Sequence, residues 1–238
     1  RLGGWMNLGR DKSVISTTQF RTDYVNQFNQ NNEFKTGIDL VFNNYDIKSF
    51  TSNPGMTTWN REQVYQVKPY RLGAYIQDKL EFEGFIANVG VRLDYTDSNT
   101  DYYELSQYDD MYKEGNGDDI EEVATAKDAE AHWALSPRIG VSHPITENSK
   151  LYFNYGHFRT EPASTYRFRI QREYNGLVTS IGNPNLEQEK TVSYEIGYSQ
   201  DLFARILLNI AGYYKDVTNQ IGWITYQNIN ASVDYLTP

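Results

Sequence analysis

The sequence contains no cysteine, which excludes a disulfide scaffold, a cysteine-ligated zinc site and a thiol nucleophile. No stretch approaches the roughly 18 consecutive apolar residues of a transmembrane helix. A transmembrane β-barrel remains allowed, because its strands are short and apolar only at alternate positions. The P-loop, the Gly-x-Ser-x-Gly elbow and the Gly-x-Gly-x-x-Gly loop are also missing.

Positive charge is scarce: the 238 residues include 22 Lys and Arg against 31 Asp and Glu, a net charge of −9. Such a chain is a poor candidate for binding nucleic acid, whose phosphates attract cations. Aromatic residues make up 15% of the chain, too many for a disordered acidic tail. The acidity is local, since twelve acids and two lysines between Thr96 and His132 sum to −10.

Apolar and polar residues alternate along several segments, which is the pattern of β-strands with one apolar face. The clearest segments are 34–42, 70–77, 85–95, 191–199 and 205–215. The apolar faces carry aromatic residues near their ends, namely Tyr70, Phe85, Tyr95, Tyr198 and Tyr214. An aromatic girdle of a membrane barrel would lie at these positions. A soluble antiparallel sheet, which also alternates, is the other interpretation.

The lengths of the connectors favour the barrel. We predict nine strands, at 14–28, 34–48, 64–80, 85–95, 133–143, 150–158, 190–199, 204–216 and 221–230. Short and long connectors alternate between them, so in an up-and-down meander every long loop falls on one side. Short periplasmic turns and long external loops are typical of outer-membrane barrels. No linker composition divides the chain, so residues 1–238 are interpreted as one domain.

The long acidic segment has three interpretations. It is a solvated external loop, a Ca²⁺ site, or a surface for a cationic ligand or partner. The candidate calcium ligands are Asp118, Asp119, Glu121 and Glu122. The tyrosines between the acids suit an adaptable binding surface, with Tyr102, Tyr103 and Tyr108 as candidate ligand contacts. No other cofactor is expected.

The loop after residue 158 is rich in arginine and aromatic residues, the usual composition of a binding hot spot. Its candidate ligand-binding residues are Arg159, Tyr166, Arg167, Arg169 and Arg172. The alternative is that these arginines pair with the acidic loop or with anionic lipopolysaccharide. The sequence leaves both roles open.

Three stretches together resemble motifs of TonB-dependent outer-membrane receptors. The first runs from Gly73 to Leu80 and on through Val89–Tyr95, which is similar to a hairpin of the pattern aYxQD followed by GvRxD. The second, Leu135–Ser142 with Leu151–Phe158, resembles the sPRxg and lyxnyg.f hairpin. The third, Gly182–Thr191 with Tyr194–Tyr198, resembles NPxLkPEkt followed by syElGy. The residues Phe153–Phe158 resemble the Oar-like branch of Bacteroidota receptors, which often carries a carboxypeptidase-regulatory-like domain.

The resemblance implies a cell outer-membrane barrel of about 22 strands with a plugged lumen. It implies import of an extracellular ligand, such as an iron chelate, cobalamin, a glycan or a peptide, by energised plug movement through a periplasmic TonB complex. It also implies a protein that is not an enzyme, since binding and translocation need no covalent chemistry. The residues expected to face the lumen are Arg71, Tyr75, Gln77, Arg92, Asp94 and Glu195. The residues expected to face lipid include Ile38, Leu40, Leu72, Ile76 and Ile196. A surface lipoprotein lid and a larger membrane assembly are further expected partners.

Nine strands do not close a barrel of that size. We therefore expect the chain to be a middle-to-late part of the barrel, without the plug domain and the C-terminal strands. Two alternatives remain open at this point. One is a complete small outer-membrane barrel of eight to ten strands, acting as a porin, adhesin or membrane enzyme, and the other is a surface-exposed β-rich binding protein.

Overall fold

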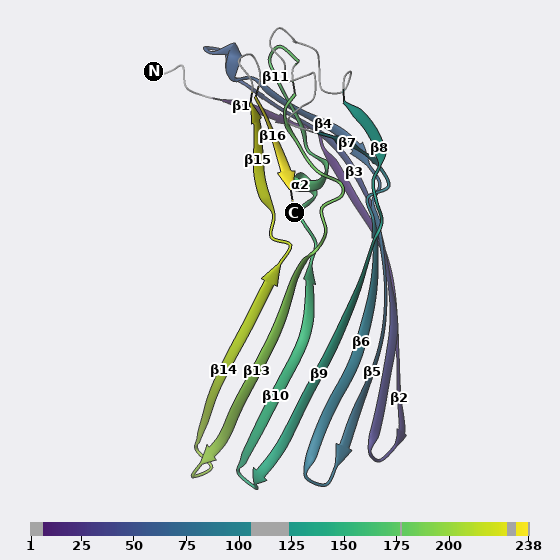
Figure 1. The fold of residues 1–238 in the computed structure, drawn as a ribbon, viewed down its shortest axis with the longest axis vertical. Coiled ribbons are helices and arrows are strands. Elements are labelled where there is room, and N and C mark those ends of the chain that lie inside the picture. Colours follow the sequence, from purple (N-terminus) through teal and green to yellow (C-terminus); the bar gives the residue numbers. More distant parts are fainter. Residues whose placement is uncertain (1–6, 106–123, 177, 228–231, 238) are drawn as a thin grey trace.

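The computed structural model describes residues 7–105, 124–176, 178–227 and 232–237, which form one large curled sheet with loop elements at one end (Figure 1). Eight long strands pair with their sequence neighbours in an antiparallel meander. They are β2 (Val14–Asn29), β3 (Asn32–Ser52), β5 (Tyr70–Phe82), β6 (Phe85–Asp97), β9 (His132–Thr146), β10 (Ser149–Thr160), β13 (Glu189–Leu202) and β14 (Ile206–Thr218). The all-β, up-and-down prediction is confirmed as a curled half-barrel.

The predicted strand at 64–80 is divided in the structure into β4 (Arg61–Val67) and β5. The break lies at Lys68 and Pro69, because proline has no N–H to donate to the ladder. The carbonyl of Pro69 still accepts the backbone N–H of Asn43 at 3.0 Å. Val67 lies opposite Tyr45 and Tyr70 lies opposite Phe42, so β3 pairs with both pieces in one register. The path of the strand was therefore predicted correctly, and only its continuity was wrong. The short strand β1 (Leu8–Asp11) extends β2 along β3 in the same way.

The short connectors of the meander lie together at one end of the half-barrel and the long loops lie at the other (Figure 1). The short turns are residues 30–31, 83–84, 147–148 and 203–205. The long loops are 53–60, 98–131 and 161–188, and they contain η1 (Thr57–Trp59), the hairpin β7 (Asp101–Glu104) and β8 (Thr125–Asp128), α2 (Ser164–Phe168), β11 (Ile170–Glu173) and β12 (Val178–Ile181). The predicted sorting of the loops is confirmed.

The ninth predicted strand, 221–230, overlaps β15 (Gly222–Gln227) but does not continue the meander. β15 pairs with β16 (Ser232–Thr237), and β16 pairs in parallel with β12 in the loop region. Within the described residues, β2 and β14 each have a long partner on one side only. The eight-stranded sheet therefore does not close on itself.

The outer face of the sheet is apolar and open to its surroundings. Ile38, Ile76 and Ile196 are 48%, 47% and 55% exposed. Leu40 and Leu72 lie on the same face, because side chains two residues apart along a strand point the same way. An exposed apolar surface of this extent needs an apolar partner, and its contact with lipid stays a prediction. In the part of the chain that the structure describes, no helix has the length and apolar character to cross a bilayer.

Aromatic side chains line the outer face near the ends of the strands that lead into the long loops. Phe42, Tyr70, Tyr95 and Trp133 form a row in which neighbouring ring centroids are 4.7–6.2 Å apart. The hydroxyl groups of Tyr70 and Tyr95 donate hydrogen bonds to Asp97. A second row on β10, β13 and β14 consists of Tyr155, Tyr194 and Tyr214. Rings with an apolar body and a polar tip suit the interface between lipid and water.

The two faces predict different responses to a new charge. Replacing Ile76 by Lys places a cation in the middle of the lipid face, where it costs roughly 2–4 kcal/mol. Replacing the adjacent Gln77 by Lys places the same cation on the inner face, beside polar side chains. We expect Ile76→Lys, and not Gln77→Lys, to lower the free energy of unfolding measured by urea titration of the whole protein in lipid vesicles. Equal losses for the two variants would contradict the assignment of the faces.

Candidate functional site

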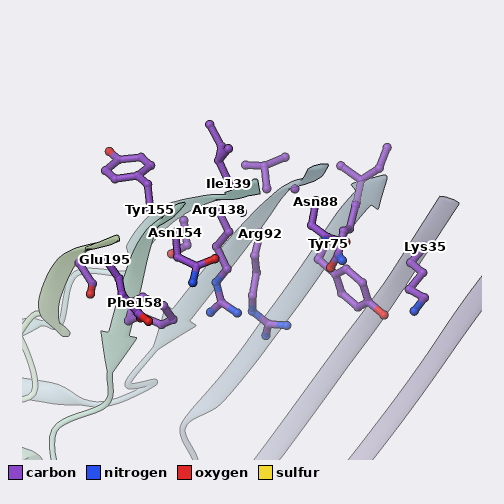
Figure 2. A pocket seen from close by; sticks show the side chains of 18 of the residues that line it. Lys35, Tyr75, Asn88, Arg92, Arg138, Ile139, Asn154, Tyr155, Phe158 and Glu195 are labelled. Atoms are coloured by element: carbon purple, nitrogen blue, oxygen red, sulfur yellow. The ribbon is translucent and has the colours of Figure 1, made fainter. Parts of the chain in front are cut away.

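The inner face of the sheet holds a hollow of about 670 Å³ that extends from β2 to β13. Figure 2 shows Lys35, Tyr75, Arg92 and Arg138 directed to the same side of the sheet. Tyr155 and Ile139 point to the opposite side, as the alternation of a strand requires (Figure 2). On the inner face of the sheet, the lining of the hollow is therefore rich in polar and cationic side chains.

Arg92 is the centre of a charge network on this wall. Its Nε lies 2.9 Å from both carboxylate oxygens of Asp94, and a terminal nitrogen lies 2.7 Å from one of them. Asp39 lies 3.8 Å from Arg92 and 3.9 Å from Arg71, so its carboxylate is shared between two cations. A Cβ on Gly73 would lie 2.2 Å from the guanidinium of Arg92. The glycine therefore leaves the space that Arg92 occupies against the strand.

Tyr75 is fixed in a similar way on the neighbouring part of the wall. Its hydroxyl donates a 2.6 Å hydrogen bond to Asp23, and Asp23 also accepts Nε of Arg21 at 2.9 Å. Gly37 lies directly opposite Tyr75 in the β3–β5 ladder. A Cβ on Gly37 would lie 2.5 Å from the ring, 2.6 Å from the Asp23 carboxylate and 2.8 Å from the carbonyl oxygen of Thr22. The ring therefore lies flat over the glycine.

The wall formed by β9, β10 and β13 is less completely paired. The guanidinium of Arg138 lies 4.8 Å from the ring centroid of Phe158. Among the described residues, Arg138 forms no ion pair with a carboxylate, and Glu195 forms no ion pair with a cation. Asn154 lies between them, opposite both Gly140 and Glu195. The Glu195 carboxylate is hydrogen-bonded to Tyr152. This part of the hollow therefore presents polar groups that no ion pair neutralises among the described residues.

The structure places all six residues predicted to face the lumen on the inner side. Tyr75, Gln77, Arg92 and Glu195 line the hollow, Asp94 binds Arg92, and Arg71 lines a second cavity of about 290 Å³ nearer the long loops. The alternation of the strands alone made this placement predictable. Their contacts with other parts of a complete barrel remain predictions.

The loop between β10 and β13 folds inward against the upper wall. Phe168, at the end of α2, is 5% exposed and packs with Tyr65 and Val67 of β4. Tyr45 and Ile47 of β3 border the same cluster. Burying a phenylalanine contributes about 1.5–3 kcal/mol, enough to hold the loop in place. The sequence analysis did not predict this insertion, although an apolar residue between two arginines was a visible signal.

Arg167 lies inside the loop rather than at its surface. It is 5% exposed, and its guanidinium lies 3.4 Å from the carboxylate of Glu161. It also donates to the hydroxyl of Ser98, which in turn donates to the carbonyl oxygen of Pro184 at 2.7 Å. Burial lowers the pKa of the Arg167 guanidinium, and the charge of Glu161 opposes this shift. Arg167 thereby joins the loops on either side of β9 and β10.

Four of the predicted ligand contacts meet at one place. Tyr102, Tyr103, Arg167 and Arg169 line a cavity of about 190 Å³ beneath the long loops. Tyr103 also packs against the small cluster of Val178 and Ile181. The composition of the two loops predicted the residue types, but only the fold brings them together.

The other predicted contacts are spread over the loop region. Tyr166 is 37% exposed and its ring meets that of Trp223 edge-on at 6.2 Å. Arg169 lies over the same indole at 5.7 Å, so Trp223 is a neighbour that sequence analysis missed. Arg172 lies opposite Glu62 in the β11–β4 ladder, and Arg159 lies at the end of β10.

The remaining candidates lie outside the described residues. They are Tyr108 and the four candidate calcium ligands Asp118, Asp119, Glu121 and Glu122. Within the described residues, no group of three or more His, Asp or Glu side chains could hold a metal ion. A calcium site in the acidic loop remains a prediction.

Residues 3–236 match the family model described as TonB dependent receptor-like, beta-barrel. The chain belongs to this family. The family is one of outer-membrane transport receptors. No curated protein matches the chain.

Two solved structures share the fold. The hemophore receptor HasR of Serratia marcescens, in complex with its hemophore HasA and heme, superposes with a TM-score of 0.60 at 17% identity, over 96% of this chain and 37% of the receptor. The copper transporter OprC gives a TM-score of 0.59 at 16% identity, over 94% of this chain and 33% of OprC. The chain therefore spans about a third of the length of the receptors that it matches.

The flat packing of Tyr75 predicts that Gly37→Ala destabilises the sheet by about 1–3 kcal/mol, because the added methyl group overlaps the ring and a backbone carbonyl. Gly212→Ala is the matched control, since a Cβ there meets nothing within 4 Å. The control is expected to be neutral or to stabilise by up to about 1 kcal/mol. The whole protein of each variant is unfolded in increasing guanidinium concentration. The fraction that keeps its heat-modifiable gel mobility gives the unfolding midpoint of each variant. A harmless Gly37→Ala would show that the Tyr75 ring is free to move.

The buried position of Arg167 predicts that Arg167→Ala loosens the inward-folded loop by about 1–3 kcal/mol, because Ser98 and Pro184 lose a buried partner. Arg169→Ala removes a similar side chain that borders the cavity and covers Trp223 but, among the described residues, joins no two loops by side-chain hydrogen bonds; the contact with Trp223 is worth about 0.5–1 kcal/mol. Limited proteolysis of intact cells, with mass spectrometry of the cleavage sites, should show faster cutting within 161–188 for Arg167→Ala. Cleavage at the same rate in both variants would contradict the joining role of Arg167.

Proposed function

We propose that this chain is part of an outer-membrane TonB-dependent receptor, which binds an extracellular ligand and imports it by energised movement of a plug that lies outside the present chain. The observation that carries the proposal is the family match over residues 3–236 together with the half-barrel. The apolar outer face and the sorted loops support a receptor that spans the outer membrane. The open edges at β2 and β14 do not favour a small closed barrel, and the exposed apolar face does not favour a soluble protein.

On this proposal the inner wall has two tasks. The paired network around Arg92, Asp94 and Asp39 is satisfied within the wall, which suits a surface along a water-filled path. Arg138, which forms no ion pair among the described residues, and Glu195, whose carboxylate is hydrogen-bonded to Tyr152, would be available for contact with the plug. Arg71, Tyr75 and Gln77 would line the path or touch the plug.

The ligand would first meet the long loops. Tyr102, Tyr103, Arg167 and Arg169 border a cavity there, and Arg159, Tyr166 and Arg172 lie in or beside the same loop region. Tyr108 would belong to the same surface. HasR is a hemophore receptor and OprC a copper transporter, so receptors of similar fold serve unrelated ligands. The ligand class of this chain is therefore left to experiment.

The finer assignment rests on sequence motifs. The residues Phe153–Phe158 support placement with Oar-like receptors of Bacteroidota. The proposed partners are the outer-membrane lipids, lipopolysaccharide, the periplasmic TonB complex and a surface lipoprotein lid or larger assembly. Structural calcium in the acidic loop is the single proposed cofactor.

Gene deletion in the native host tests the import function. Cells with and without the gene would be supplied with haem, ferric siderophores, copper, cobalamin, glycans and peptides, each as the limiting nutrient. We expect deletion to abolish uptake of one of them, measured with labelled compound, and loss of TonB to abolish the same uptake. Uptake that is lost on gene deletion but persists without TonB would overturn energised import and support a passive porin.

A further inference from the structure

Two cations face each other at the ends of β10 and β13 that lead into the long loops. Arg159 and Lys190 are direct partners in the β10–β13 ladder, and each is partly exposed. Their charges also act on the imidazole of His157, so the three groups lie close together. Like charges directly opposite each other destabilise a sheet unless something compensates for them.

Both cations lie on the lipid side of the sheet. Phe158 points into the inner hollow with Arg138, whereas Tyr155 points away from it (Figure 2). Arg159 is four residues from Tyr155 and Lys190 is four residues from Tyr194, so each shares the outward face of its tyrosine. The pair therefore continues the outer face beyond the aromatic row.

The protein itself does not neutralise this pair. Among the described residues, neither Arg159 nor Lys190 forms an ion pair, and Nε of Arg159 is buried without a hydrogen-bond partner. The nearby carboxylate of Glu161 is paired with Arg167, and that of Glu187 accepts Asn219. Asp216, opposite Val192 on β14, also forms no ion pair in the part of the chain that the structure describes.

The distance of Arg159 and Lys190 from the aromatic row, measured along the membrane normal, indicates which layer of the membrane surrounds them. Four residues of strand extend about 13 Å, and a strand tilt near 40° reduces this to about 10 Å along the membrane normal. Girdle tyrosines mark the edge of the hydrocarbon core, and the headgroup layer extends several ångströms beyond it. Arg159 and Lys190 therefore lie at the level of lipid headgroups, at the end of the barrel that carries the long loops.

We propose that Arg159 and Lys190 form a binding site for a phosphate group of lipopolysaccharide in the outer leaflet. The hydroxyl of Tyr155 lies 2.7 Å from Nε2 of His157. The ring of Tyr155 lies below the cations and would contact the adjoining sugar or acyl chain. A phosphate offers the charge that would relieve the repulsion between the two side chains. The site rests on the proposed location of the receptor in the outer membrane.

The test uses the whole receptor, extracted from outer membranes in mild detergent. The variant is Arg159→Gln with Lys190→Gln, and the conservative variant is Arg159→Lys with Lys190→Arg. Arg205→Gln with Lys150→Gln is the matched control, because it removes two positive charges at the short-turn end, where Arg205 and Lys150 are exposed. Heat-modifiable mobility shows that each variant is folded. The binding probes are purified rough lipopolysaccharide, the same material after phosphatase treatment, and phosphatidylglycerol vesicles.

We expect the Gln variant to bind phosphorylated lipopolysaccharide roughly 30-fold more weakly than the native protein, the effect of two cations beside an anionic lipid surface. The conservative variant and the control should keep native binding. Phosphatase treatment should weaken binding by these two variants and by the native protein, but not by the Gln variant. Equal binding by the Gln variant, or equal binding of phosphatidylglycerol, would overturn the proposal. A receptor that fractionates outside the outer membrane would instead overturn the proposed function, before any lipid is added.

Discussion

Within a bilayer every backbone N–H and C=O group must find a partner inside the protein, and this constraint determines the rest of the structure. The strands between β2 and β14 satisfy it by pairing on both sides, and β3 keeps one register even across the break at Pro69. In a paired strand, each side chain can point in only two directions, toward the outer face or toward the inner face of the sheet. Ile76 and Gln77, neighbours in sequence, consequently meet opposite surroundings. The alternation of apolar and polar residues in the sequence therefore makes the outer face apolar and the inner face polar.

The inner surface shows how such a wall holds charged residues without an ordinary core. Arg92 pairs with Asp94 on its own strand, β6, and lies 3.8 Å from Asp39 on β3, the next strand but one. Large side chains lie flat where the opposite position is glycine, so that Tyr75 covers Gly37 instead of projecting into the lumen. Each bond of this kind is exposed to water on one side and is worth little alone. Several bonds that share partners fix the orientation of the side chains, and fixed orientation is what a recognition or transport surface requires.

The strands, their faces and the sidedness of the loops could be predicted from the sequence, because period-two alternation and connector length are local properties. The break at Pro69 also has a local cause, since proline removes a donor from the ladder. The sequence analysis missed it because the alternation continues from β4 into β5. The placement of 221–230 could not be predicted in the same way. β15 has the composition of a strand, yet its partner, β16, is fixed by pairing with β12 in the loop region. Long-range pairing of this kind leaves no periodic signal.

The arginines after residue 158 show why composition alone does not identify a site. A single loop rich in Arg and aromatic residues predicted one binding surface, but the fold gives its arginines different environments. Arg159 remains on a strand, so alternation turns it toward the outer face, where we propose that it binds a headgroup phosphate. Arg167 follows the inward path of α2 and is buried against Ser98, where its charge holds loops together. Arg169 covers Trp223 and borders the cavity that also contains Tyr102. Identical side chains thus acquire different roles from the direction of the backbone, and a mutation series that treats them as one patch would average over unrelated effects.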